Sequence, residues 1–199
     1  IQRFRWLRLF TFLISSLIII MLTFFLPHVK SRMIDNTIIE LGIKNNIKSL
    51  NAFSPAHEDH YISALNMFYD NPLFGQGPKL FRYLCTNPKF YPEEPFDTLT
   101  LGCSTHPHNT YIQLLAELGI FGILPVFGLF TYLIYLLGQQ FFSLYIKRKG
   151  TLLTDPQICL LIAMVLSLWP LAPTGNFFGN WINVTYYLPV GFYLYQTSK

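Results

Sequence analysis

The chain has 199 residues, of which 52% are hydrophobic and only 12% are charged, with a formal net charge of +4. Soluble domains carry roughly 25% charged residues, so this composition argues against an ordinary soluble domain and favours an all-α integral membrane protein. The first residue is Ile rather than Met, and we therefore expect further segments upstream.

Four apolar stretches are candidates for membrane crossing. Residues 9–26 and 120–137 contain no charged side chain, and each approaches the length of about 20 residues that a bilayer requires. Residues 158–172 and 177–195 are shorter or are interrupted by prolines and asparagines. We predict about four transmembrane helices, at 1–26, at 119–142 and as a pair within 158–195. A re-entrant hairpin is the alternative for that last pair.

Basic residues beside the apolar stretches predict the orientation. They precede the first stretch, follow the second and end the chain: Arg3, Arg5, Arg8, Lys147, Arg148, Lys149 and Lys199. Short basic flanks mark the cytoplasmic side of a membrane. We therefore assign residues 143–157 to a cytoplasmic loop and residues 196–199 to a cytoplasmic tail. Residues 27–118 form a long loop on the opposite side.

This long loop contains all five histidines of the chain, namely His28, His57, His60, His106 and His108. Its acidic residues outnumber its basic ones, which argues against nucleic acid as a partner. The motif SPAHEDHYISALNMFYDNP predicts a helix that starts near Ser54-Pro55 and ends at Asn71-Pro72. Directly after it, Gly75 and Gly77 in the sequence GQGP predict a tight turn.

Cys85 and Cys103 flank a proline-rich stretch in the same loop. A compartment outside the cytoplasm is oxidising, so we expect these two cysteines to form a disulfide. Closing a loop of this size would stabilise the fold by roughly 3 kcal/mol. The alternative is a pair of free thiols. Cys159 lies in an apolar stretch, and we interpret it as a small hydrophobic residue.

The segment GCSTHPHNTYIQLLAELGIFGIL combines polar groups with the start of an apolar helix. Ser104 or Thr105 is the expected helix cap, with Pro107 and His108 in the first turn. The positive potential at a helix start disfavours imidazolium and attracts anions, so His108 should be neutral near pH 7 beside a seat for phosphate. A neutral imidazole can act as a general base. The competing interpretation is an ordinary cap or surface histidine, which we keep for His106.

Helical spacing places His108, Ile112, Leu115, Gly119 and Gly122 on one stripe. The two glycines would let a neighbouring helix pack closely beneath the histidine. Metal binding by His57, Asp59 and His60, or by His106 and His108, is a weak alternative, because H-x-D-H and H-x-H lack further ligands. We expect neither a metal nor another cofactor.

At these residues the chain resembles the bacterial O-antigen ligase and O-antigen polymerase superfamily. The superfamily pattern of His-Asn followed by Gly-x-x-Gly is matched by His108, Asn109, Gly119 and Gly122. The upstream segment ALNMFYDNPLFGQGP resembles the superfamily's helix and P-L-x-G-x-G-P turn, with Gly75 and Gly77 in the turn. The closing segment PTGNFFGNWINVTYYLPVGFYL is also similar.

The resemblance implies the carboxy-terminal half of a multi-pass protein of the bacterial inner membrane, with the long loop in the periplasm. Such enzymes transfer a glycan from an undecaprenyl diphosphate-linked donor to an acceptor sugar hydroxyl, such as that of the lipid A core. They invert the anomeric carbon and need no metal. Carried over, His108 would be the general base, and Asn109 would orient the acceptor or the imidazole.

The diphosphate leaving group requires cations, because negative charge accumulates on it during transfer. Arg82 is the first candidate, since its guanidinium can bind phosphate through two hydrogen bonds, and Lys79 is the second. Many superfamily members carry an arginine at the start of the loop helix, where this chain has His57. Diphosphate binding here therefore depends on Arg82 or on residues upstream.

Three further functions compete with the lipid A core ligase. Within the same class are a polymerase that joins repeat units and a ligase that acts on a protein such as pilin. The third is a non-enzymatic transporter or scaffold for lipid-linked glycans. A transporter would hold ionisable residues near the bilayer midplane. The two uninterrupted apolar stretches here, 9–26 and 120–137, contain no charged residue, which favours catalysis in the loop.

Overall fold

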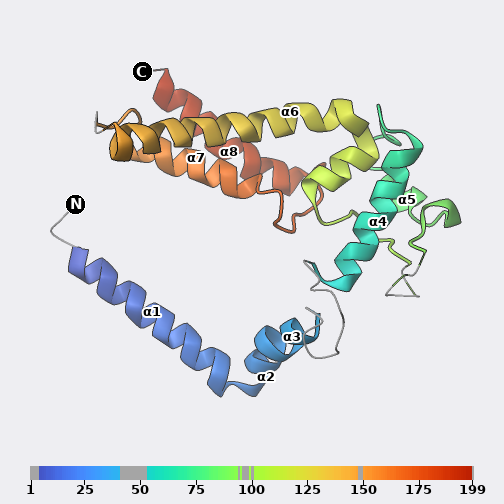
Figure 1. Cartoon of the computed structure of the whole chain (residues 1–199), viewed down its shortest axis with the longest axis horizontal. Helices are drawn as coiled ribbons and strands as arrows, with labels where there is room; N and C mark the ends of the chain where they lie inside the picture. Colours follow the sequence, from blue (N-terminus) through green and yellow to red (C-terminus); the bar gives the residue numbers. More distant parts are fainter. Residues whose placement is uncertain are drawn as a thin grey trace. The chain divides into compact units, whose positions relative to one another are not determined.

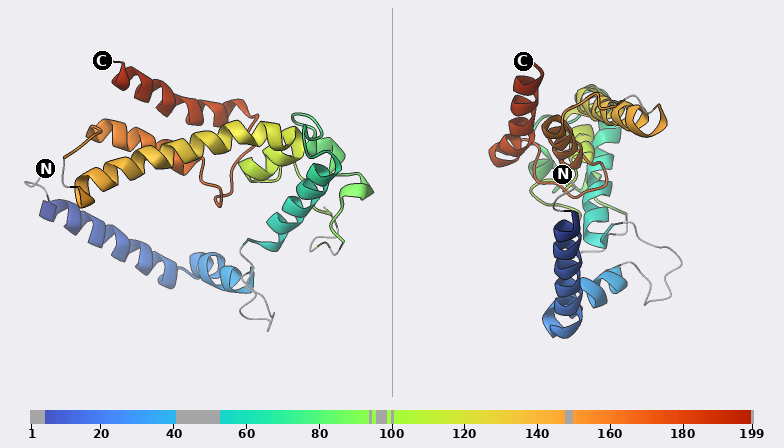
Figure 2. Two further views of the ribbon diagram at one scale, coloured as in Figure 1. Left: turned by 45° about the horizontal axis from the view of Figure 1, so that its top comes forward. Right: turned by 90° about the vertical axis from the view of Figure 1, so that its left-hand side faces the viewer.

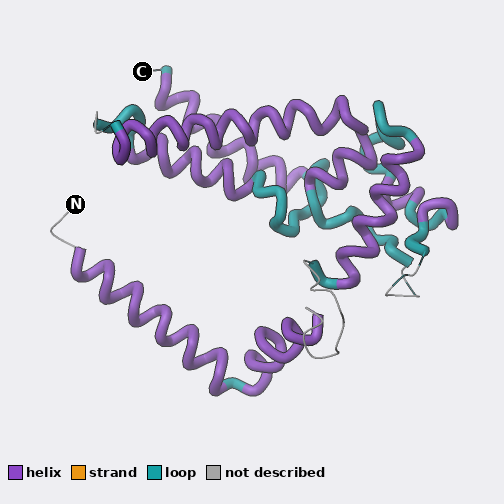
Figure 3. The backbone as a smooth tube through the Cα atoms, viewed as in Figure 1, coloured by secondary structure: helices purple, strands orange, loops and turns teal. Residues whose placement is uncertain are grey.

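The computed structural model describes residues 5–40, 53–93, 95, 99, 101–147 and 150–198. Over these residues the chain consists of helices and loops without a strand (Figure 3), which confirms the predicted all-helical class. The chain divides into two compact units, Ile1–Pro55 and Ala56–Lys199, and each is described by itself.

The first unit contains one long helix followed by short helical pieces. Helix α1 (Arg5–Phe25) covers the first predicted apolar stretch. It ends at Leu26, whose backbone is extended, and Pro27 then starts α2 (Pro27–Lys30). A π-helical turn, η2 (Ser31–Asp35), leads into α3 (Asn36–Glu40). The large apolar side chains of α1 are exposed, as expected for a helix that meets lipid or another part of a larger protein.

The second unit begins with the helical part of the long loop (Figure 1). Helix α4 (Pro55–Asp70) has the start and the end that the sequence predicts. The short helix α5 (Phe81–Leu84) and a 3₁₀ turn, η3 (Pro88–Phe90), follow the glycine turn. Their side chains form a core with α4 and with the first turns of the next helix. The buried residues of this core are Ala64, Met67, Phe81, Cys85, Phe90 and Ala116.

Three apolar helices complete this unit. Helix α6 (Thr110–Phe141) continues into a π-helical turn, η4 (Phe142–Ile146). Helix α7 (Asp155–Ser167) starts with a capping box in which the side chains of Thr154 and Gln157 each bind the other residue's backbone. Helix α8 (Asn180–Thr197) closes the chain. In Figures 1 and 2, α7 lies alongside α6, and it also packs against α8.

The predicted number of four membrane spans is not confirmed. Within the described residues, one helix, Thr110–Ile146, is long and apolar enough to cross a membrane. A second candidate is the pair Leu9–Phe25 and Pro27–Ile38, whose two parts are bent by 93°. Helix α7 has only 13 residues, fewer than the roughly 20 that a straight crossing needs. The assignment of the loops to the two sides of a membrane stays a prediction.

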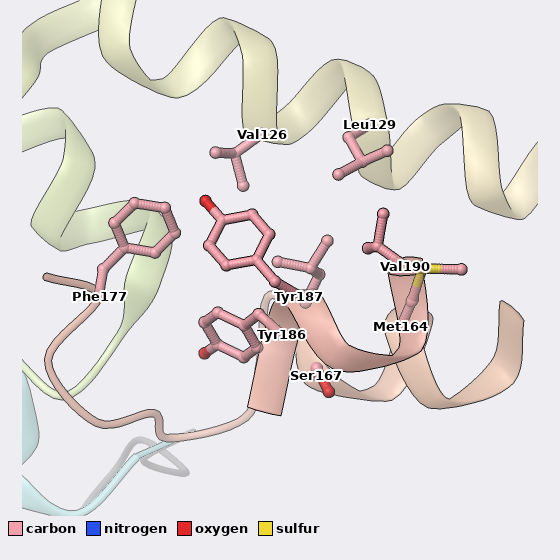
Figure 4. A pocket seen from close by; sticks show the side chains of 9 residues that line it. Val126, Leu129, Met164, Ser167, Phe177, Tyr186, Tyr187 and Val190 are labelled. Atoms are coloured by element: carbon pink, nitrogen blue, oxygen red, sulfur yellow. The ribbon is translucent and has the colours of Figure 1, made fainter. Parts of the chain in front are cut away.

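Figure 4 shows a small apolar cavity between α6, α7 and α8, where Val126 and Leu129 face Tyr187 and Val190. Its volume is about 70 Å³. Ligand pockets typically have about 300–1,000 Å³. We therefore interpret this cavity as a packing gap between helices rather than as a ligand site.

Candidate active site

Four histidine side chains gather at the start of α6. The ring centroid of His108 lies 4.2 Å from that of His106, 5.2 Å from that of His57 and 5.6 Å from that of His60. The sequence interpretation singled out His108, noted His57 at the position of a superfamily arginine, and otherwise treated His57, His60 and His106 as surface residues or weak metal ligands. A signal for this gathering was available in α4, where His57 and His60 are three residues apart, because residues at this spacing share one face of a helix. In the described part of the chain, no three His, Cys, Asp or Glu residues are placed to hold a metal ion.

The prediction for the start of α6 was wrong. Asn109 is the N-cap, and its side-chain oxygen accepts hydrogen bonds from the backbone N–H groups of Tyr111 and Ile112. Asparagine is among the preferred N-cap residues for this reason. His108 therefore lies outside the helix, with a positive φ of 56°. Ser104 and Thr105 do not cap α6.

The imidazole of His108 is neutral near pH 7, as expected from the sequence. Its pKa is lowered from 6.5 to about 4. Burial is the main cause, because it penalises the charged form. The neighbouring histidines His106, His57 and His60 lower the pKa further, in that order. The helix macrodipole is therefore not needed to explain the neutral ring.

This lowered pKa predicts how stability depends on pH. Between pH 6.5 and about 4 the unfolded chain protonates His108 while the folded chain does not, so acidification through this window should destabilise the fold. The effect should be absent above pH 6.5, where both states are neutral. An NMR titration of the imidazole resonances, assigned with His108→Gln, should show one ring that titrates near pH 4. A His108 ring that titrates at its ordinary value would contradict its partial burial among the other histidines.

The connection between α7 and α8 holds the histidine segment in place. The backbone N–H of Thr174 donates to the carbonyl of His108 at 2.8 Å. The carbonyl of Thr174 is 3.3 Å from His106 Nε2, and Thr105 Oγ1 is 2.9 Å from His106 Nδ1. These contacts suit a neutral His106 that donates from Nε2 and accepts at Nδ1. Asn109 Nδ2 also donates to the carbonyl of Pro170 at 2.7 Å.

Helix α6 is broken at Gly119, whose φ of 66° and ψ of −161° are not helical. The prediction that Gly119 and Gly122 form a smooth stripe for a neighbouring helix was therefore wrong. A methyl group added at Gly119 would lie 2.4 Å from the backbone of Leu73, and one added at Gly122 would lie 2.0 Å from Leu118 Cβ. Both glycines therefore make room for the break itself.

The turn after α4 fills the break in α6. Four backbone hydrogen bonds join the two segments at 2.8–3.3 Å, as follows: Gln76 N–H to Ala116, Gly77 N–H to Glu117, Ile120 N–H to Pro72 and Phe121 N–H to Leu73. A methyl group added at Gly75 would lie 2.4 Å from the backbone carbonyl carbon of Glu117. The glycine turn and the Gly-x-x-Gly motif thus form one interlocked structure, although they lie far apart in the sequence.

The side chain of Glu117 is buried and binds the segment after the glycine turn, in addition to the backbone hydrogen bond that Glu117 accepts from Gly77. Its carboxylate accepts from the backbone N–H groups of Lys79 at 3.0 Å and Phe81 at 2.9 Å. Gln113 Nε2 donates to the same carboxylate at 3.1 Å and also to Asn176 Oδ1 at 3.0 Å. The sequence interpretation missed Gln113 and Glu117. Their signal was two polar residues four apart in an otherwise apolar helix, which places them on one face.

Comparison with known protein families shows where this chain belongs. A family model described as O-antigen ligase matches residues 1–127. The chain belongs to the O-antigen ligase family. No curated protein and no solved structure gives a significant match. The family consists of membrane-associated glycosyltransferases of the ligase or polymerase type, with lipid-linked glycans as substrates. The match includes the interlocked glycine motifs and His108, and it ends before the loop that holds Thr174.

In this O-antigen ligase family member, both residues predicted to bind phosphate are exposed, and the structure relates one of them, Arg82, to the histidines. Arg82 is exposed on α5, and its positive charge reaches His106. Burial lowers the pKa of His106 most, and Arg82 lowers it further against the opposing hydrogen bond to Thr174. Lys79 is exposed in the turn with a φ of 63°, and its backbone is held by Glu117.

The predicted cysteine pair fixes α5 to the histidine segment. Cys85, next to α5, is joined by a disulfide to Cys103, with a Cα–Cα distance of 5.0 Å. Lys89, the third basic residue after the turn, forms an ion pair with Asp70 instead. The assignment of Arg82 and Lys79 to diphosphate binding stays a prediction.

Proposed function

We propose that this chain carries the catalytic loop of a metal-independent, inverting O-antigen ligase. The enzyme would move a glycan from undecaprenyl diphosphate to a sugar hydroxyl of the lipid A core. It would be a multi-pass protein of the bacterial inner membrane with this loop in the periplasm. Membership of the O-antigen ligase family supports the reaction class.

The observation that carries the proposal is the neutral imidazole of His108, next to the N-cap of α6 and among three further histidines. In the proposed step, His108 takes the proton from the acceptor hydroxyl as its oxygen attacks the anomeric carbon. The bond from that carbon to the diphosphate oxygen breaks, and the diphosphate leaves with the electron pair. Arg82 and Lys79 would bind the charge that develops on it.

Asn109 has a positioning role in this proposal. Its carbonyl oxygen caps α6 and its amide nitrogen donates to Pro170, so both ends of the side chain are already bound. Asn109 would hold the backbone beside His108 rather than bind the acceptor itself.

A base with a pKa of about 4 is weak at neutral pH. Binding of the donor would raise this pKa. An anion beside an imidazole favours its protonated form and so raises its pKa. Binding of the diphosphate would therefore bring His108 closer to the range in which a general base is most effective. The donor and the base would be coupled through charge.

Deleting the full-length gene, with the intact gene restored as the control, tests the function. Loss of a ligase should leave long polymer attached to the lipid carrier, with lipid A core that bears no polymer. Loss of a polymerase should leave lipid A core with a single repeat, which would favour the second candidate. Unchanged surface and carrier-linked glycan would contradict both functions. Loss of transport should keep the glycan on the cytoplasmic side, where periplasmic enzymes cannot reach it.

A further inference from the structure

A hollow of about 750 Å³ lies beside α4, on the side of that helix away from the histidines. Its polar and aromatic lining comes from α4, from η3 and from the residues that follow η3: Asn66, Tyr69, Asp70, Lys89, Tyr91 and Glu93. Asn66 follows His57 by nine residues, or about two and a half turns at 3.6 residues per turn, so the two side chains leave opposite faces. We call this hollow the α4 groove.

The α4 groove combines the side chains that suit a sugar ring. A sugar ring has apolar C–H faces and a rim of hydroxyl groups. The rings of Tyr69, which is 71% exposed, and Tyr91 offer flat surfaces for such faces. The amide of Asn66 and the carboxylates of Asp70 and Glu93 are planar hydrogen-bonding groups for the hydroxyls.

Several of these groups are already held in position. Asn66 Nδ2 donates to the carbonyls of Phe90 and Tyr91, at 3.3 and 3.2 Å, and so ties the backbone of Tyr91 to α4. The phenol of Tyr91 donates to the carbonyl of Thr86 at 2.9 Å. A site built from fixed groups loses less entropy when a ligand binds.

Asp70 is ionised in this arrangement, and its carboxylate can accept hydrogen bonds that sugar hydroxyls donate. Hydrogen bonds from Lys89 and Gln76 lower the pKa of its carboxyl, with a further contribution from the Lys89 charge. The groove thus holds one basic residue against two acidic ones, Asp70 and Glu93. This balance suits a polyhydroxyl chain better than a phosphate-rich ligand.

We propose that the α4 groove binds a stretch of glycan at a distance from the histidine cluster. The family's substrates are lipid-linked glycans, so a glycan is the class of ligand that we assign to the groove. The inference rests on the proposed function only for the identity of that glycan, which is either the polymer on the donor or the core sugars of the acceptor. The groove would favour long glycan chains, because only these could occupy the α4 groove and reach the histidine cluster at the same time.

Calorimetry on the full-length protein in nanodiscs tests the proposal with two soluble probes. One is an oligosaccharide series of one to several O-antigen repeats, and the other is the lipid A core oligosaccharide. The variants are Tyr69→Ala and Tyr91→Ala. The control is Tyr83→Ala, which removes a similarly exposed tyrosine outside the groove, 67% exposed. We expect the groove variants to weaken binding about three- to tenfold, whereas the control should bind as the wild type does.

The two probes distinguish the sources of the glycan. Weaker binding of the repeats alone would assign the groove to the donor polymer, and weaker binding of the core alone would assign it to the acceptor. Wild-type affinity of both groove variants for every probe would overturn the proposal. This result is separate from the catalytic test, because binding is measured without transfer. A protein that binds glycan through the groove but transfers none would support the proposed glycan site and contradict the proposed reaction.

Discussion

His108→Ala should lower the rate of glycan transfer by about 10²–10⁴-fold, the range that a general base contributes. The loss should fall on kcat, because a neutral imidazole adds no charge with which to hold the diphosphate of the donor. The fold should survive the change. The hydrogen bond that His108 receives from Thr174 uses the backbone carbonyl, which alanine retains.

The measurement is single-turnover transfer from a purified undecaprenyl diphosphate-linked donor to an acceptor core, by the full-length protein in lipid. His28→Ala is the matched control, since it removes a histidine that belongs to the first unit and is not one of the four gathered rings. The pH profile adds a readout that a structural role would not change. The acid limb of kcat in the wild type should lie above the pH of about 4 at which the free ring titrates, because the bound diphosphate raises the pKa of His108. A folded His108→Ala protein with wild-type kcat would refute the assignment of the base.

Local sequence signals predicted α4 well, because residues at each end of the helix favour its start and its end. Pro55 starts the helix, and Asn71-Pro72 follows its last residue, Asp70. The start of α6 was different, because Ser104, Thr105 and Asn109 all offer a capping side chain. The hydrogen bond from Asn109 to Pro170, 61 residues away, is a contact that no local pattern contains.

Periodicity misled the interpretation where the backbone leaves the helix. The stripe from His108 to Gly122 assumed one straight helix, yet His108 lies before it and Gly119 interrupts it. Composition likewise identified the apolar stretches but not how long their helices would be, so a helix of 13 residues was counted as a span. Glu117 was overlooked because its partners, the N–H groups of Lys79 and Phe81, come from a distant turn.

The structural interlock should be the most sensitive point of the fold, and Gly119→Ala should disrupt it. The backbone at Gly119, with φ of 66° and ψ of −161°, is a conformation that essentially only glycine adopts. Forcing alanine into it costs about 1–3 kcal/mol. The added methyl group would also lie 2.4 Å from the backbone carbonyl of Leu73, so the turn must move away from α6.

That movement would break the backbone hydrogen bonds between the turn and α6, each worth about 1 kcal/mol. With four such bonds, the expected total is on the order of 5–7 kcal/mol, seen as a large fall in the apparent melting temperature of the full-length protein in lipid. Gly128→Ala is the control on the same helix, because a methyl group there meets no atom within 4 Å, and it should be neutral or slightly stabilising. Equal melting temperatures for the two variants would mean that the turn does not lock the break. Since Glu117 joins the same turn to Lys79 and Phe81, loss of the lock should also displace Arg82 and weaken donor binding in any Gly119→Ala protein that still folds.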